Sequence, residues 1–169
     1  MSDHAKYVDN VEKMLIPTFK PYVEYKNLVR LGRFTIQPIK LKHDVSCYGF
    51  MIKHEEMGKL VYITDTEYCK YTFKEVNHFL AEANYDETMI DKNAPNYEHV
   101  VKGHMSIQKT CEFLKANNNP LLENVFICHL SAENSSSDTF IKEVEKVVNC
   151  NVKIARKGMC ENVTLIPFG

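Results

Sequence analysis

Two side chains that can bind a metal ion each follow an apolar, strand-like run. Asp65 stands just after the β-branched run of residues 60–63, and His129 directly follows the apolar run of residues 125–128. In open α/β sheets, ligands and metals are handled at the carboxyl ends of the strands. We therefore expect Asp65 and His129 to meet at one edge of one sheet as two ligands of a metal site.

Three more candidate site residues lie next to sequence patterns that predict a hairpin, a strand end or a helix start. His43 precedes a predicted hairpin, Glu82 ends a short apolar run, and His104 lies in Gly103-His-Met-Ser just before a predicted helix. A carboxylate and an imidazole together can act as the acid and base that protonate an alkoxide leaving group. Each residue also has a plain structural interpretation. His104 can bond to backbone at a helix end, Glu82 can be solvated, and Asp65 can stabilise a turn.

The six cysteines are scattered, without a C-x-x-C pair or the spacing of a zinc knuckle. Four of them lie in or beside apolar runs, which is typical of buried reduced thiols. Cys128 directly precedes His129 and should therefore point to the opposite face of its strand. We expect the cysteines to have a core role.

The composition is that of a globular protein, and the length of 169 residues predicts a single domain over residues 1–169. The formal net charge of −1 gives no field that would recruit nucleic acid in bulk, although a local basic groove would not appear in that sum. The sequence contains neither an apolar run long enough for a membrane span nor a signal peptide. We expect a cytoplasmic protein without a membrane partner.

The elements that must position these residues are strands with interleaved helices, an α/β or α+β arrangement. Pro38 indicates an edge strand or a bulge, Gly58 a hairpin turn with a positive φ, and Ser106 a helix N-cap. Residues 86–97 are expected to form a loop or a broken helix. The predicted strands cover residues 34–41, 49–52, 60–63, 79–84, 125–128, 152–155 and 163–166, and the predicted helices cover residues 1–15, 107–117 and 139–148.

Taken together, these residues resemble the second half of a metallo-β-lactamase-fold hydrolase. The resemblance rests on Asp65 in Ile-Thr-Asp-Thr, His43 in Lys-His-Asp and His129 in His-Leu-Ser-Ala-Glu-Asn, and it spans about residues 34–166. The order is similar to the branch with ribonuclease Z-like and exonuclease-like members, often found in bacteria and their phages. It implies an α/β fold, part of an αβ/βα sandwich, with a C-terminal sheet and flanking helices.

The resemblance also implies roles for individual residues. His43 would bind one metal ion, Asp65 would bridge two ions, and His129 would bind the second. Glu82 is similar to the acidic strand end of the family, and His104 to a Gly-His-Ser helix start near the site. Asp65, Glu82 and His104 are therefore the expected catalytic residues, with zinc or manganese as the metal.

One departure from the family is large, because the H-x-H-x-D-H signature is absent. Asp3-His4 looks like the tail of that motif, and the chain looks like a domain that lacks its N-terminal third. The ligand set that remains for one ion is Asp3, His4, Asp65 and His129, whereas the ion at His43 keeps few ligands. We expect one zinc or manganese site at most, and the sequence leaves open that none is bound.

Two classes of function follow. The first is a metal-dependent phosphodiesterase or nuclease, active alone or when completed by a partner. The alternative is a non-catalytic remnant or protein-interaction module of the same fold; a small-molecule esterase or lactonase is a third reading. A missing sheet would expose apolar surface, so we expect self-association, most simply a twofold dimer, or pairing with a separately encoded N-terminal segment.

Overall fold

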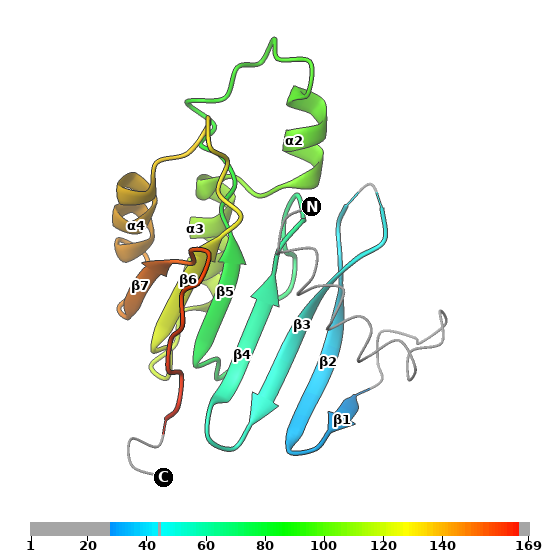
Figure 1. Cartoon of the computed structure of the whole chain (residues 1–169), viewed down its shortest axis with the longest axis vertical. Helices are drawn as coiled ribbons and strands as arrows, with labels where there is room; N and C mark the ends of the chain where they lie inside the picture. Colours follow the sequence, from blue (N-terminus) through cyan, green and yellow to red (C-terminus); the bar gives the residue numbers. More distant parts are fainter. Residues whose placement is uncertain (1–27, 44, 166–169) are drawn as a thin grey trace.

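The computed structural model describes residues 28–43 and 45–165. Their strands form one seven-stranded sheet in which the spatial order follows the chain order (Figure 1). The strands are β1 (Val29–Leu31), β2 (Phe34–Leu41), β3 (Cys47–His54), β4 (Gly58–Ile63), β5 (His78–Glu82), β6 (Asn124–Cys128) and β7 (Asn151–Ile154), and the helices are α2 (Tyr97–Gly103), α3 (Ile107–Asn117) and α4 (Ser137–Glu145).

The first half of the sheet, from β1 to β4, is antiparallel. The β3–β4 hairpin turns at Gly58, whose φ of 73° confirms the predicted left-handed glycine. β1 pairs only with residues 34–36 of β2, so Pro38 lies beyond the end of β1. The outer side of β2 is therefore an edge at Pro38 in the described structure, and this explains why a residue without an N–H is tolerated there.

The second half, from β4 to β7, is parallel. α3 lies between β5 and β6 in the chain, and α4 lies between β6 and β7. The carboxyl ends of β4, β5 and β6 all point to the upper edge of the sheet in Figure 1. This confirms that the segments after these strands meet at one edge, where parallel sheets usually present a site.

The hydrophobic core joins this parallel half to α3 and α4. Phe79 of β5 meets Phe113 of α3 edge to face, with ring centroids 5.4 Å apart. Such a pair contributes about 0.5–1.5 kcal/mol beyond its buried area. The core residues include Val61, Ile63, Phe79, Val125 and Ile127 of the sheet and Ile107, Phe113, Leu114, Phe140 and Val144 of the helices.

The prediction for α3 is confirmed, and the Ser106 side chain accepts from the backbone N–H of Lys109 as an N-cap does. β1 and α2 were not predicted. The strand predicted for residues 163–166 is wrong over 163–165, where the backbone is irregular. The reason is that Leu165 donates one backbone bond to Glu56 in the hairpin turn instead of pairing along a strand. Residue 166 and the predicted helix 1–15 lie outside the described residues.

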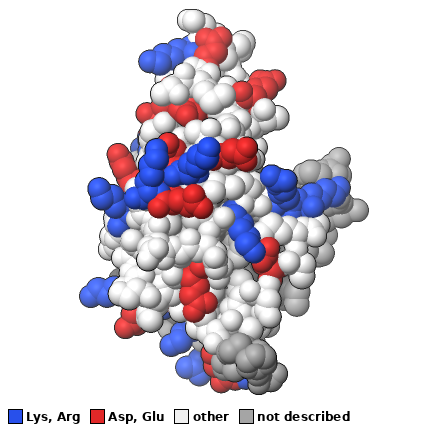
Figure 2. All heavy atoms as spheres, turned by 90° about the vertical axis from the view of Figure 1, so that its left-hand side faces the viewer, with Lys and Arg blue, Asp and Glu red and all other residues white. Residues whose placement is uncertain are grey.

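Charges are mixed on the α4 side of the molecule. Figure 2 presents this face, on which basic and acidic side chains lie next to one another. Such a surface has no extended field of one sign, in keeping with the net charge of −1. Among the described residues, no helix is both long and apolar enough to cross a membrane.

Candidate metal centre

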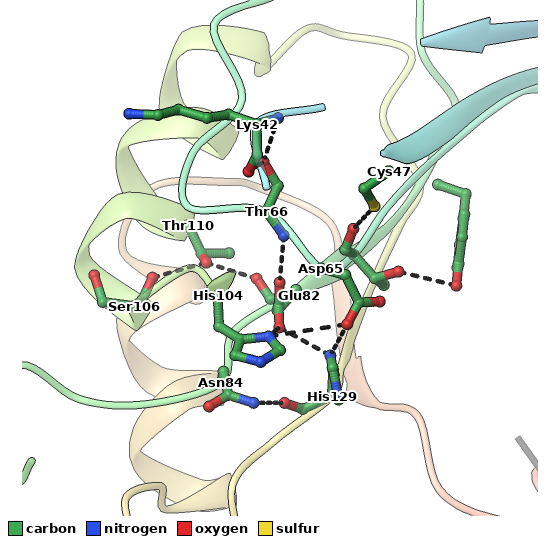
Figure 3. Close-up of polar contacts among 12 residues, drawn as sticks. Lys42, Cys47, Asp65, Thr66, Glu82, Asn84, His104, Ser106, Thr110 and His129 are labelled. Atoms are coloured by element: carbon green, nitrogen blue, oxygen red, sulfur yellow. Dashed lines mark hydrogen bonds and ion pairs between the residues drawn. The ribbon is translucent and has the colours of Figure 1, made fainter. Parts of the chain in front are cut away.

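Four side chains that can ligate a metal converge at the upper edge of the sheet. Asp65 follows β4, Glu82 ends β5, His129 follows β6, and His104 lies between α2 and α3 (Figure 3). One ligand atom from each lies within 4.8 Å of the other three. The sheet therefore brings together residues that are 64 positions apart in the sequence, Asp65 and His129.

Asp65 and His129, which follow the strands on either side of β5, have unusual backbone conformations. Asp65 has a φ of 56° and His129 a φ of 59°, in the left-handed region that few residues other than glycine adopt. Asp and His enter this region more readily than bulky residues, but the conformation still costs free energy. The turn at each position ends its strand sharply and directs the side chain toward Glu82 (Figure 3).

Glu82 lies at the centre of the group and is fully buried. Its Oε1 accepts a hydrogen bond from Nδ1 of His104 at 2.6 Å and lies 2.9 Å from Nδ1 of His129. Oδ1 of Asp65 lies 3.4 Å from the same His129 nitrogen and 3.9 Å from Nδ1 of His104. One buried oxygen thus faces two imidazoles, with a second carboxylate beside them.

Burial and hydrogen bonding oppose each other in this group. Burial raises the pKa of Glu82, but bonds from His104 and His129 outweigh it, so its pKa lies below the usual range. The bond to Glu82 raises the pKa of His129 despite burial, and the negative charges of Glu82 and Asp65 add to that rise. The arrangement therefore favours a charged carboxylate beside a protonated imidazole.

Hydrogen bonds from neighbouring segments fix Glu82 and His129 in place. The Thr110 hydroxyl of α3 donates to the backbone carbonyl of Glu82 at 2.6 Å, and the Thr66 backbone N–H donates to Glu82 Oε2 at 3.3 Å. Asn84 Nδ2 donates to the backbone carbonyl of His129 at 2.7 Å. The acidic group is therefore bonded on both oxygens and through its backbone, which suits a preorganised site.

Two further histidines surround His104. His43, a predicted ligand, has its ring centroid 6.2 Å from that of His104, but its nitrogens lie outside the group of four. Its Nδ1 accepts from the backbone N–H of Val45. His99 of α2, for which the sequence offered no partner, lies with its ring 6.1 Å from His104. No local signal pointed to it, because His99 comes near His104 only through α2, which the sequence did not predict.

The donor set fits a divalent cation. Zinc and manganese accept imidazole nitrogens and carboxylate oxygens, and two of each lie within 4.8 Å of one another here. Of the predicted ligands, Asp65 and His129 belong to this group, and His43 lies next to it. Asp3 and His4 lie outside the described residues.

Comparison with solved structures identifies the fold. Residues covering 89% of the chain superpose on the metallo-β-lactamase fold protein YhfI from Bacillus subtilis, with a TM-score of 0.61 and 20% identity. The short form of human tRNase Z matches 80% of the chain with a TM-score of 0.51 and 19% identity. A diphosphatase from the PhnP family matches 89% with a TM-score of 0.54 and 11% identity.

The described chain therefore has the α/β architecture of part of the metallo-β-lactamase fold. It spans 60%, 45% and 53% of the lengths of YhfI, tRNase Z and the diphosphatase, respectively. No protein-family model matches the sequence. No curated protein matches it either.

Proposed function

We propose that the chain is a divalent-metal-dependent hydrolase of phosphodiesters, a phosphodiesterase or nuclease. The proposal rests on the shared contact of His104 and His129 with the buried oxygen of Glu82, beside Asp65, at the ends of parallel strands. Two proteins of similar fold, named as a tRNase and a diphosphatase, support a phosphate ester as the substrate, whereas a third is named as an isothiocyanate hydrolase. An esterase or lactonase has no such support.

Asp65 and His129 are the proposed metal ligands within the described residues, and His43, whose ring lies 6.2 Å from that of His104, remains a proposed ligand from the sequence. Asp3 and His4 remain proposed ligands from the sequence. A zinc or manganese ion held there would polarise the phosphoryl oxygen and lower the pKa of an attacking water. His129 must lose its proton to bind, and the adjacent Asp65 carboxylate gives the ligand pair a compensating negative charge.

Glu82 and His104 are proposed to transfer the proton. Because Glu82 Oε1 accepts from Nδ1 of His104, the imidazole keeps Nε2 as the nitrogen that can hand a proton to the departing alkoxide. The buried carboxylate orients the ring, as a carboxylate does in a hydrolytic triad. The Thr66 and Thr110 bonds hold Glu82 in the orientation that this transfer requires.

Metal analysis and a generic substrate test this function. The purified chain, incubated with zinc or manganese and desalted, should retain metal and hydrolyse bis-p-nitrophenyl phosphate. Asp65→Ala should lose both properties, whereas the exposed Asp138→Ala on α4 should keep them. Retention of fewer than about 0.2 equivalents by the wild type would contradict the proposal. It would favour the alternative of a non-catalytic interaction module.

We also propose that the chain self-associates through the sheet face that alternates with the core residues. Phe50 pairs with Tyr62 and Ile52 with Leu60, and Tyr62 lies beside Leu80 on the next strand. All five side chains are apolar or aromatic and remain partly exposed. Apolar surface of this kind is typical of a protein interface, and a second copy would cover it.

Light scattering on a size-exclusion column tests the self-association. The wild type should elute as a dimer at micromolar concentration, and Leu60→Lys should elute as a folded monomer. A compact wild-type monomer would contradict the proposed dimer. A monomer that forms a stable complex with a separately expressed N-terminal segment would identify that segment as the partner instead.

A further inference from the structure

The segment from Glu67 to Thr72 follows the proposed metal ligand Asp65 directly and runs beside α3. Between this segment and α3 lies a cleft of about 410 Å³. We call it the tyrosine groove, after Tyr68 and Tyr71, which line it together with Phe113 of α3. Asp65 and Tyr68 are three positions apart, so their backbones are at most about 11 Å from each other.

The two tyrosines present their rings to solvent and each is paired with an ammonium group. Tyr68 is 41% exposed and Tyr71 is 37% exposed. The Lys42 Nζ lies 4.8 Å from the centroid of the Tyr68 ring, and the Lys70 Nζ lies 5.4 Å from that of Tyr71. Tyr68, Lys70 and Tyr71 thus lie on one segment that follows the proposed ligand Asp65, and Lys42 approaches it from the end of β2.

The charges around the groove leave a positive surplus. Glu67 contacts the Nζ of Lys42 at 2.8 Å and the Nζ of Lys109 at 3.7 Å, so two lysines share one carboxylate. The bond from Lys42 holds the pKa of Glu67 below its usual range, which keeps this carboxylate charged. The lining residues Lys70 and Lys109 balance Glu67 and Glu112, and Lys42, which contacts Glu67 and lies over the Tyr68 ring, adds one positive charge beside the groove.

From this arrangement we propose that the tyrosine groove binds single-stranded nucleic acid and leads it to the site after β4. Unpaired bases have π-faces that stack on exposed aromatic rings, and lysines bind the phosphates between them. A strand bound at Tyr68 reaches Asp65 within a few nucleotides, since stacked nucleotides rise about 3.4 Å each. The inference rests on the proposed phosphodiester hydrolysis for the use of the site, and names its substrate class.

Binding is measured separately from hydrolysis. Fluorescence anisotropy with labelled oligothymidylate and oligouridylate is recorded in excess chelator, so that no cleavage occurs. Tyr68→Ala and Tyr71→Ala should each raise Kd about tenfold, and Tyr68→Phe should restore binding because the ring is kept. The control Tyr48→Ala removes a phenol that is 38% exposed on β3, outside the groove, and should leave Kd unchanged. The two oligomers distinguish DNA from RNA as the strand.

Lys109→Gln tests the charge component. It should weaken binding of all sequences and reduce the salt dependence of the affinity by about one phosphate contact. Equal affinity for a blunt duplex, or an unchanged Kd in both tyrosine variants, would contradict the proposal that the tyrosine groove binds single-stranded nucleic acid. If the groove binds as expected and the wild type hydrolyses no phosphodiester with added metal, the proposed function fails and the binding site stands. If the protein hydrolyses bis-p-nitrophenyl phosphate but does not bind the oligonucleotides, the proposed function stands and the proposed binding site fails.

Discussion

Asp65 and His129 meet across the end of β5 at 3.4 Å, and both have a left-handed backbone. The side chains that would bind the metal thus stand on the two least favourable backbone positions of the site. Replacing Asp65 with Gly should relieve the strain, whereas Asp65→Ala keeps it. The free energy of unfolding of the Gly variant should exceed that of the Ala variant by about 1 kcal/mol.

Urea denaturation of the metal-free variants measures this difference. The matched pair is Glu56→Gly and Glu56→Ala, at an exposed turn position without a positive φ. There the Gly variant should not be the more stable of the two, because glycine gains entropy on unfolding. Equal stability of the two Asp65 variants would show that the left-handed turn is not strained.

His104→Ala should affect substrates according to their leaving group. A dinucleotide releases a sugar alkoxide that needs a proton, so its hydrolysis should fall by about 10²–10⁴-fold. Bis-p-nitrophenyl phosphate releases a stable phenolate and should lose far less. Steady-state kinetics with both substrates measures the ratio, and His54→Ala on β3 is the control. Equal losses for the two substrates would assign His104 to another role, such as metal binding.

Gly103→Ala should lower the rate of hydrolysis without lowering the free energy of unfolding. A Cβ at this position would lie 3.2 Å from Nε2 of His43, so the His43 ring would have to move by a few tenths of an ångström. Ala at a helix end removes the entropic cost of Gly, and the free energy of unfolding should stay equal or rise by up to about 1 kcal/mol. Hydrolysis should fall, by less than about 100-fold. Unchanged activity would argue against a role for His43; Lys102→Ala is the neighbouring control.

Thr110→Val should lower the free energy of unfolding by removing a hydrogen bond to Glu82. It keeps the side-chain shape but removes the hydroxyl that donates to the Glu82 carbonyl in a buried position. The expected loss in free energy of unfolding is about 1–3 kcal/mol. Denaturant titration measures it, with the exposed Thr139→Val on α4 as control. A loss no larger than that of the control would mean that this bond contributes nothing.

His78 makes stability depend on pH at the opposite edge of the sheet. It is fully buried, its Nε2 contacts the Met57 carbonyl at 3.0 Å, and Asn124 Nδ2 lies 3.0 Å from its Nδ1. Burial lowers the pKa of His78, so the folded state prefers the neutral ring. The stabilisation is therefore complete above the unfolded pKa of about 6.5 and is lost as pH falls below it toward the folded pKa.

The measurement compares the free energy of unfolding at about pH 7.5 and about pH 5.5 in the wild type and His78→Gln. The wild type should lose more stability over this interval, because Gln does not titrate. Parallel losses in the two proteins would show that titrating groups other than His78 cause the pH dependence.

Much of the parallel half of the fold could be predicted from the sequence, because each strand is a short apolar run that ends at a polar residue. The carboxyl ends of parallel strands meet at one edge by geometry, so Asp65 and His129 were expected to lie together, whereas Glu82 was placed near them by the family resemblance. Ser106 marked the start of α3 through its capping preference. The local signal and the tertiary arrangement agreed at these positions.

The remaining elements depend on contacts that a local pattern does not contain. α2 has no side-chain N-cap bond and follows a segment of turn residues, so no local sequence signal predicted a helix there. The apolar residues of 163–165 fitted a strand, but the chain bonds to the β3–β4 turn instead. His99 was missed because its neighbour His104 comes near only once α2 has formed.

The central carboxylate has a consequence for how acidity controls the site. Glu82 is fully buried and its pKa lies below the usual range, while its contact with His129 raises the pKa of that imidazole and favours a proton there. A divalent cation that takes His129 as a ligand displaces this proton. Proton and metal ion would then compete for one nitrogen, so the proposed metal affinity should fall as the pH falls.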